Sequence, residues 1–438
     1  MREGGECALK EWGIVRLTTV LGAGATVDIG GITADKLTNE VVMKEQRYKD
    51  IDDKEKHRML LSDIYQALHP YKQNATINFE DIMNSLENLY SMHESTKIRT
   101  PWVAIAELKK TFQGLERRMI LRAHSDLLTI VGDSISKYDI SFINHDRYSD
   151  FKNFWIQISK ECPLDLFTLN YDTVLEQCFE KNFIDGFGDL NEVMGVEGNS
   201  ARRFQPTILE KEKEKSKILH LHGCINFARA TLRIPNHNQF AFQESYMDMY
   251  KYNTYKEANE HWWGENAIIT QSGDAVFNDP ILFGLRKPDK ILYGYPYSYY
   301  FRELQDAIIS NHSLLIIGYS CGDQYINNWL TRMMEIHGKK RRVVIVNYYD
   351  RNKTLCSDAH KTDKKDEVQI ISDSEFNVYS KLMQEEYAGI IYPIADEVKG
   401  LPTDGKIISK DSCVRIYFEG FHTAIIKYGD EIINFLNS

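Results

Sequence analysis

Short, uninterrupted apolar runs recur along the chain, and most of them end in a polar residue or a glycine. The runs occupy residues 14–21, 165–170, 218–223, 280–284, 313–320 and 342–347. Strands that are buried on both faces of a sheet have this continuous pattern, whereas half-exposed strands alternate between apolar and polar residues. Helical periodicity separates several of the runs, at residues 173–181, 300–310 and 324–336. Strands that alternate with helices predict an α/β fold with a Rossmann-like, doubly wound parallel sheet.

Between the first run and the second, apolar residues recur at helical spacing instead. This pattern predicts helices over residues 34–49, 54–68, 79–90 and 102–130. Thr33 and Asn78 are suitable N-caps for the first and third of these helices. Because no clear strand is evident between the glycine turn and residue 160, we expect residues 34–160 to form a helical insertion that covers the sheet rather than extends it.

The remaining residues divide into a sheet domain and an extension. Residues 14–33 and 161–350 form the predicted Rossmann-like domain, and residues 351–438 form a C-terminal extension that packs on the core. The pattern within the extension predicts a helix over 374–385, a strand over 414–421 and a last helix over 423–436. Residues 228–280 have no clear period and are expected to be a further insertion.

The composition narrows the class of protein without identifying it. The 438 residues are 43% hydrophobic and 26% charged, as is typical of a globular protein. A net charge of -10 argues against binding along a nucleic acid backbone. No apolar run reaches the ~18 residues of a membrane-spanning helix, and the first 13 residues lack the apolar core of a signal peptide. We therefore expect a cytoplasmic protein that neither enters a membrane nor binds nucleic acid directly.

The cysteines do not predict a disulfide framework or a metal site. There are 7 of them, at long spacings, and none forms a Cys-x-x-Cys pair. Cys224 and Cys321 lie beside motifs at the strand ends, but nothing in the flanking sequence suggests an activated thiolate.

Glycines and polar residues gather where the predicted strands end. The first run leads into Gly22-Ala23-Gly24, and no lysine comes after it as in an ATPase phosphate loop. A Gly-x-Gly turn after a strand is often only a turn, but it also lets a backbone approach a pyrophosphate, which free N–H groups at the turn and the next helix would hold. Later runs end near Asn170 and Asp172, His222, Gly318 and Ser320, and Asn347. Since α/β sheets bind ligands at the carboxyl ends of their strands, these residues predict one shared nucleotide site.

Taken in order, these motifs resemble those of the Sir2 (sirtuin-like) family, and specifically the SIR2-like domains of bacterial anti-phage defence systems. The matching segments are Gly22–Thr26 with Gly30, Thr168–Asp172, Leu221–Gly223, Gly318–Asp323 and Asn347. Two departures separate the chain from the protein deacylases of that family. It lacks their zinc-binding cysteine pairs, and residues 30–35 lack the Phe-Arg that ends their first motif. Both departures are similar to those of SIR2-like domains that hydrolyse NAD.

The resemblance implies that NAD is the substrate and that the bond between nicotinamide and ribose is cleaved. Asn170 would bind the ribose or the attacking water, or cap the following helix. Asp172 would stabilise the cationic ribose, or act only as a charge at a helix N-terminus. His222 suits a general base near neutral pH, the alternative being a buried structural histidine.

The resemblance also implies a set of NAD-binding residues. These are Gly22, Ala23, Gly24, Thr26, Asp28, Thr168, Gly318, Ser320 and Asn347. Thr26 and Asp28 are alternatively caps of the first helix, and Ser320 alternatively only terminates its strand. We expect His220 to be structural and Asp323 to cap the helix that runs through Trp329.

Three functions remain open at this stage. The first is an NAD hydrolase that acts as an antiviral effector by depleting NAD. Unregulated activity would kill the cell, so the resemblance implies control by self-assembly into a homo-oligomer or by a separate HerA-type ATPase partner. The second is an NAD-dependent protein deacylase, which the missing zinc cysteines disfavour. The third is a non-catalytic module that binds NAD or ADP-ribose.

Overall fold

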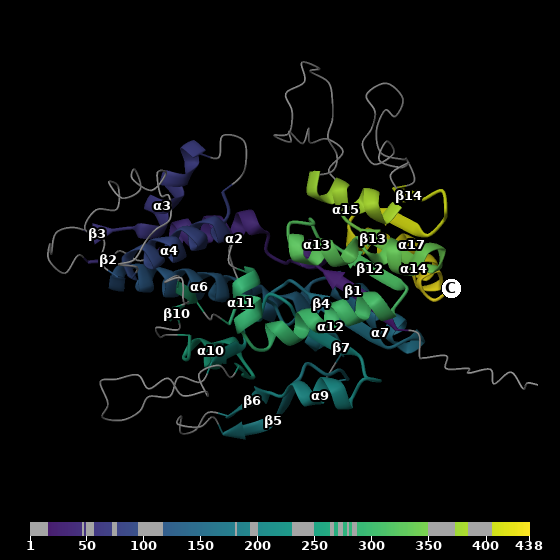
Figure 1. Cartoon of the computed structure of the whole chain (residues 1–438), viewed down its shortest axis with the longest axis horizontal. Coiled ribbons are helices and arrows are strands. Elements are labelled where there is room, and N and C mark those ends of the chain that lie inside the picture. The colour runs from purple at the N-terminus through teal and green to yellow at the C-terminus, as the bar shows by residue number, and fades with distance from the viewer. Residues whose placement is uncertain are drawn as a thin grey trace, which may run out of the picture.

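A seven-stranded sheet forms the centre of the computed structural model (Figure 1). The structure describes residues 16–45, 48–49, 57–71, 77–94, 117–179, 182–192, 200–229, 249–262, 267–269, 275–277, 280–282, 287–348, 373–383 and 405–438. The strands of the sheet are β1 (Leu17–Leu21), β4 (Leu164–Thr168), β7 (Lys217–His220), β12 (Ser313–Ile317), β13 (Arg342–Val346), β14 (Lys406–Ile408) and β15 (Val414–Tyr417). Every neighbouring pair is parallel except β14 with β15. The predicted α/β class is confirmed.

The strand order makes the sheet doubly wound. Across the sheet the order is β14-β15-β13-β12-β1-β4-β7. Numbered along the chain, the parallel strands therefore have the 3-2-1-4-5-6 type of order of the Rossmann fold. The order in which the chain adds strands to the sheet reverses between β1 and β12. In sheets of this type, ligands bind outside the strand ends at this switch point.

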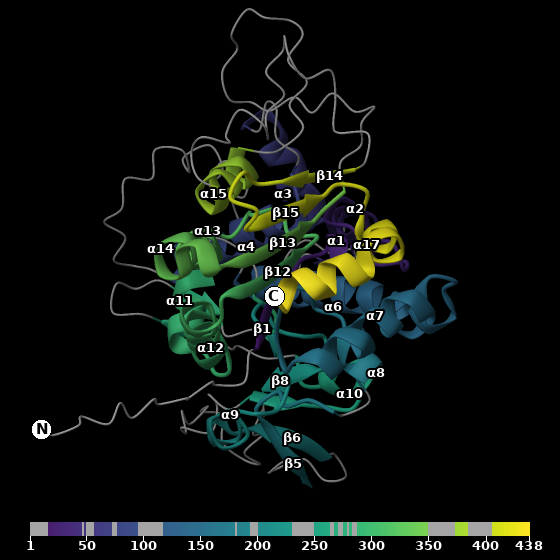
Figure 2. The ribbon, with the colours of Figure 1, turned by 90° about the vertical axis from the view of Figure 1, so that its right-hand side faces the viewer.

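The sheet is buried on both faces, as the continuous apolar runs predicted. Along β12, Leu314 and Ile316 pack into one apolar cluster, and Leu315 and Ile317 pack into another. The first face is covered by α12 (Tyr297–Ser310), α13 (Gln324–Leu330) and α14 (Met333–His337). The second is covered by α7 (Tyr148–Glu161), α8 (Val174–Phe179) and α17 (Phe421–Leu436), and Figure 2 shows α12 and α14 on the opposite side of the strands from α17.

The predicted insertion is mainly helical, but it lies at the carboxyl edge of the sheet. Its helices are α2 (Ala34–Lys44), α3 (Leu60–Leu68), α4 (Phe79–Glu94) and α6 (Arg117–Ser141). Hydrogen bonds from Tyr138 to Asp172 and from Thr173 to Asp139 join α6 to the segment after β4. The last helix within the predicted insertion, α7, instead packs on a face of the sheet. The insertion therefore closes the edge where the strand ends lie.

Several helix boundaries of the insertion differ from the prediction. Thr33 and Asn78 cap α2 and α4 as expected, through Lys36 N–H and Asp81 N–H. The helix predicted over 54–68 begins only at Leu60, because the Glu45 carboxylate accepts from the first N–H groups of α3. A short antiparallel pair, β2 (Tyr48–Lys49) and β3 (His57–Arg58), precedes it, so the expectation of no strand before residue 160 is wrong. Of the helix predicted over 102–130, residues 102–116 lie outside the described residues.

A second, antiparallel sheet lies beside the end of β7. Its order is β5-β6-β9-β8, formed by β5 (Phe187–Glu192), β6 (Ser200–Phe204), β9 (Met249–Lys251) and β8 (Phe227–Arg229). We call it the small sheet. The helices α9 (Pro206–Lys211) and α10 (Tyr255–Asn259) pack against it. The hairpin of β10 (Ala267–Ile269) and β11 (Ala275–Phe277) lies instead against α4 and α11 (Lys287–Tyr293).

The strand predicted over residues 280–284 is wrong where the structure describes it. Residues 280–282 form only an antiparallel bridge between Ile281 and Gly223. The Leu282 N–H donates to the His222 carbonyl at 2.7 Å, and the Tyr297 hydroxyl donates to the Pro280 carbonyl at 2.7 Å. This segment therefore holds the loop after β7 instead of joining the main sheet.

The C-terminal extension supplies strands as well as helices. β15 extends the sheet beside β13, and β14 closes the edge. α15 (Asp373–Met383) is fastened by the buried Arg341 guanidinium, which donates to the Leu382 carbonyl at 3.0 and 3.2 Å and to Asp411 at 2.7 Å. Within the described ranges, no helix combines the length and the apolar character needed to cross a bilayer.

Three glycines allow β1 and β12 to meet closely at the switch point. The N–H groups of Gly22 and Gly24 donate to the carbonyls of Ile317 and Gly318, at 2.9 and 3.0 Å. Gly318 has φ +58°, and a Cβ added there would lie 2.2 Å from the nitrogen of Ala25. A side chain is therefore excluded at Gly318 both by conformation and by space.

We predict that Gly318→Ala destabilises the protein, because the methyl group would push the turn away from β12. The expected loss is about 1–3 kcal/mol of unfolding free energy, measured by urea denaturation. Gly429→Ala is the matched control, since a Cβ there meets nothing within 4 Å in the interior of α17. The control should be neutral or stabilising by up to ~1 kcal/mol. Equal unfolding midpoints for the two variants would contradict the prediction.

Candidate functional site

The strand ends meet at one edge of the sheet. Thr168 at the end of β4 pairs with Leu21 of β1 on one side and with His220 of β7 on the other. Asn170 and His222 each lie two residues after a paired position on neighbouring parallel strands. The structure therefore places both residues beyond the same edge, next to the glycine turn that begins after Leu21.

The backbone of Asn170 is held in place, while its side chain is left available. Its N–H donates to the Thr168 Oγ1 at 3.0 Å, and its carbonyl oxygen lies 3.1 Å from the His220 Nδ1. The residue is 9% exposed. Among the described residues, its side-chain amide has no hydrogen-bond partner. This amide is thus a polar group open to a ligand, on a backbone that is held in place.

The His222 ring contacts the carboxylate of Asp323, which was predicted only to cap a helix. The His222 Nε2 lies 3.1 Å from the Asp323 Oδ2. The other oxygen of Asp323 accepts from the N–H groups of Tyr325 and Ile326, at 3.0 and 3.4 Å. The predicted cap of α13 is therefore confirmed, and the contact with His222 is additional. It joins residues 101 positions apart, and no local signal in the sequence indicates it.

The surroundings of His222 favour a neutral ring. Burial and the positive charge of Lys287 lower its pKa, whereas the hydrogen bond and charge of Asp323 oppose that shift. Burial raises the pKa of Asp323, but His222, Lys287 and the Ile326 N–H together lower it to about 2. Because Asp323 is an acceptor, the Nε2 of His222 carries the proton. Nδ1 is then an unprotonated acceptor with no partner among the described residues, as a general base requires.

Residues 165–371 match the family model of the SIR2-like domain. The match begins inside β4 and includes Asn170, His222, Asp323 and Asn347, whereas the glycine turn after β1 precedes it. We call these residues the SIR2-like region. The match supports the resemblance to the Sir2 family and an activity related to NAD. A comparison with curated proteins finds no match.

In the SIR2-like region, Asp172 has a clear structural task. One carboxylate oxygen accepts from the Tyr138 hydroxyl at 2.6 Å, and the other accepts from the Val174 N–H at 3.2 Å. The residue is 4% exposed, and burial raises its pKa. These contacts favour the alternative that Asp172 fixes the start of α8 against α6.

Most N–H groups of the glycine turn, which were expected to be free to hold a pyrophosphate, are already bonded. Besides Gly22 and Gly24, which donate to the end of β12, Ala25 and Thr26 donate to carbonyls within the turn, at 3.0 and 3.3 Å. These four donors are therefore not free, whereas the Ala23 N–H has no hydrogen-bond partner among the described residues. The two glycines of the turn face Gly318, since a Cβ at Gly22 or Gly24 would lie 2.5 or 2.7 Å from its backbone atoms.

Of the two caps predicted for the first helix, Thr26 is not one, whereas Asp28 is the C-cap residue. The Thr26 hydroxyl lies inside α1 (Gly24–Val27) and donates to the Ala23 carbonyl at 3.4 Å. The Asp28 carboxylate accepts from the His422 N–H at 2.9 Å and lies 3.7 Å from Arg147. Asp28 therefore ends α1 through its backbone, and its side chain caps α17.

Two other residues that the resemblance implies to bind NAD, Asn347 and Ser320, also lie in the SIR2-like region. The Asn347 amide donates to Glu375 of α15 at 2.8 Å, so it is already bound to the extension. Ser320 is exposed beyond the end of β12, next to the buried Cys321. Burial raises the pKa of Cys321, which gives no support to a reactive thiolate.

The insertion and α11 add charged groups that sequence reasoning did not select. Lys287 of α11 lies 3.1 Å from Glu80 in the first turn of α4. Burial and the neighbouring Glu80 raise the pKa of Tyr171, which lies between Asn170 and Asp172. Elements outside the Rossmann-like core therefore contribute to the electrostatics around His222.

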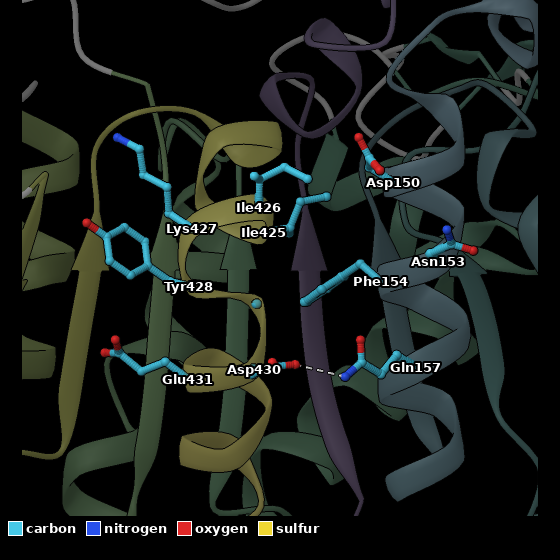
Figure 3. A pocket seen from close by; sticks show the side chains of 11 residues that line it. Asp150, Asn153, Phe154, Gln157, Ile425, Ile426, Lys427, Tyr428, Asp430 and Glu431 are labelled. Carbon is cyan, nitrogen blue, oxygen red and sulfur yellow. Dashed lines mark hydrogen bonds between the residues drawn. The ribbon is translucent and has the colours of Figure 1, made fainter.

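Figure 3 shows a hollow on the outer surface between α7 and α17. Its volume is about 260 Å³, and a hydrogen bond of 3.1 Å joins Gln157 to Asp430 across it. None of the residues predicted to bind NAD lines this hollow. We therefore keep the candidate site at the strand ends.

We predict that the pKa of His222 lies below its ordinary value of 6.5 and falls further in Asp323→Asn. The reason is that the Asp323 charge raises this pKa, while asparagine still caps α13. Titration of the histidine ring signals by NMR would measure both values, with His222→Gln used to assign the signal. An unchanged or higher pKa in Asp323→Asn would show that the carboxylate does not act on His222.

Proposed function

We propose that this protein is an NAD hydrolase that cleaves the N-glycosidic bond between nicotinamide and ribose. One observation carries the proposal: the open amide of Asn170 and the Asp323-bound imidazole of His222 lie beyond the same edge, beside the switch point of a Rossmann-like sheet. The SIR2-like match, which associates this region with NAD, supports it independently.

The chemistry needs few groups. Nicotinamide in NAD carries a positive charge, so the bond breaks with its electron pair moving to the ring nitrogen, and nicotinamide leaves neutral. The ribose passes through an oxocarbenium-like transition state, and the oxygen of a water molecule bonds to its anomeric carbon. The Asn170 amide positions the ribose hydroxyls or this water, and the Nδ1 of His222 takes the proton that the water loses.

The environment of His222 suits this step. The ring is neutral before reaction, because burial and Lys287 lower its pKa. When it accepts a proton, the nearby Asp323 carboxylate stabilises the new positive charge, 3.1 Å away. Asp172 contributes indirectly in this proposal, by fixing the start of α8 behind Asn170.

For the biological role, we infer an effector of anti-phage defence that depletes NAD. The support is the resemblance of the ordered motifs to the SIR2-like domains of such systems. Uncontrolled depletion would be lethal, so the activity requires a restraint or a trigger. Self-assembly or a separate HerA-type ATPase partner would supply it.

The direct test measures nicotinamide and ADP-ribose release from NAD by the purified protein, alone and with the ATPase. We expect Asn170→Ala and His222→Ala each to reduce turnover by about 10²–10⁴-fold, because each removes one positioned group. Asn328→Ala, an exposed residue of α13, is the control and should leave turnover unchanged. In infected cells, the same two inactive variants should preserve the NAD pool.

Three results would contradict the proposal. The absence of nicotinamide release from both samples would exclude hydrolysis. Release that requires an acyl-peptide would favour a deacylase. Binding of NAD that survives both alanine substitutions, without turnover in the parent, would favour a non-catalytic module.

A further inference from the structure

A buried cluster of charged residues lies directly behind Asn170. It consists of His220, Glu176, Lys251, Asp185 and Arg202. We call it the ion network. His220, Lys251 and Asp185 are 1–3% exposed. The network starts at the end of β7 and crosses to the small sheet, which contributes Lys251 from β9 and Arg202 from β6.

Both ring nitrogens of His220 face oxygen acceptors. Nδ1 lies 3.1 Å from the carbonyl oxygen of Asn170, and Nε2 lies 2.8 Å from Glu176. Neither partner can donate, so both nitrogens donate, and the ring carries two protons and a positive charge. The charge is stabilised by Glu176, whose oxygen also accepts from Lys251 at 3.0 Å. His220 is therefore a fixed donor to the Asn170 backbone and not only a buried ring.

The remainder of the network fixes Glu176. Lys251 also donates to Asp185 at 2.9 Å, and Asp185 in turn lies 3.2 Å from Arg202. Charges alternate in sign along this series, so each group is held between opposite charges. Glu176, His220 and the thiol of Cys224 lie close enough together to bind a metal ion. The Lys251 ammonium already provides the positive charge there, which disfavours a second cation.

We propose that His220 is a positioning residue for NAD hydrolysis, and that Lys251 of the small sheet acts through it to hold Asn170. The inference rests on the function proposed above. The Asn170 carbonyl is the acceptor at the end of this series, and its N–H is bound by Thr168. With the N–H and the carbonyl both bound, the peptide groups on either side of Asn170 are held, and the direction of its Cα–Cβ bond is fixed. Misplacement by about 1 Å can cost ~100-fold in rate.

Two substitutions of His220 separate positioning from general stability. The amide nitrogen of asparagine occupies nearly the position of Nδ1, and that of glutamine nearly the position of Nε2. His220→Asn therefore keeps a donor for the Asn170 carbonyl, whereas His220→Gln keeps a donor only for Glu176. We expect kcat to fall about 10- to 100-fold in His220→Gln with little change in KM, and to be largely retained in His220→Asn.

Lys251→Met tests the long-range part of the proposal. Lys217→Met is its matched control, because Lys217 forms a similarly buried ion pair with Glu303, 2.6 Å long, at the other end of β7. Lys251→Met should lower kcat about 10-fold or more and speed hydrogen exchange at residues 169–172, while Lys217→Met should do neither. Equal effects of the two lysine substitutions, or equal kcat in His220→Asn and His220→Gln, would overturn the inference.

Hydrogen exchange and NAD hydrolysis, measured together, show separately whether this inference fails and whether the proposed function fails. If the parent protein does not hydrolyse NAD, the proposed function fails, whatever the exchange rates show. If it hydrolyses NAD but Lys251→Met changes neither kcat nor exchange at residues 169–172, only the positioning inference fails.

Discussion

The candidate site depends on one constraint, which is that three neighbouring strands of the sheet end side by side at the same edge. β1, β4 and β7 are parallel and in register, so Leu21, Thr168 and His220 lie side by side across the sheet. The residues directly after each strand then form one part of the site. A shift of two residues in the pairing of β4 with β7 would displace the Asn170 amide relative to the His222 ring by about 6–7 Å, since a strand advances about 3.3 Å per residue.

Packing on the sheet maintains this register. Apolar side chains leave β12 and β13 alternately toward two separate clusters, so a slip by one residue would exchange the two cores. The polar contacts then refine the arrangement at the edge. Thr168 and His220 fix the backbone of Asn170, and Asp323 fixes the ring of His222. The fold sets positions to within a few ångströms, and these hydrogen bonds set the orientation of the reacting groups.

The sequence predicted best those features that depend on residues close together in the chain. Continuous apolar runs identified β1, β4, β7, β12 and β13, because strands with both faces buried need no polar residues. The same rule failed for residues 280–282, since an apolar segment can be buried in a bridge beside the sheet as well as within it. Capping by Thr33, Asn78 and Asp323 was also predictable, because a cap depends on residues only two or three positions away.

Contacts between distant residues were not predictable in this way. The pairing of His222 with Asp323, and of His220 with Glu176 and Lys251, depends on how strands and helices are placed in space. The donors of the glycine turn were expected to be free, but those of Gly22 and Gly24 are bonded to the end of β12. Asp28 similarly caps α17, a helix that begins far along the chain, at Phe421. Each of these required the tertiary structure.

A structure of the protein with bound ADP-ribose would test the central claim most directly. The account predicts that the diphosphate lies beside the glycine turn between β1 and β12, with the terminal ribose between the Asn170 amide and the His222 ring. ADP-ribose bound elsewhere, for example in the hollow between α7 and α17 and away from both residues, would contradict it.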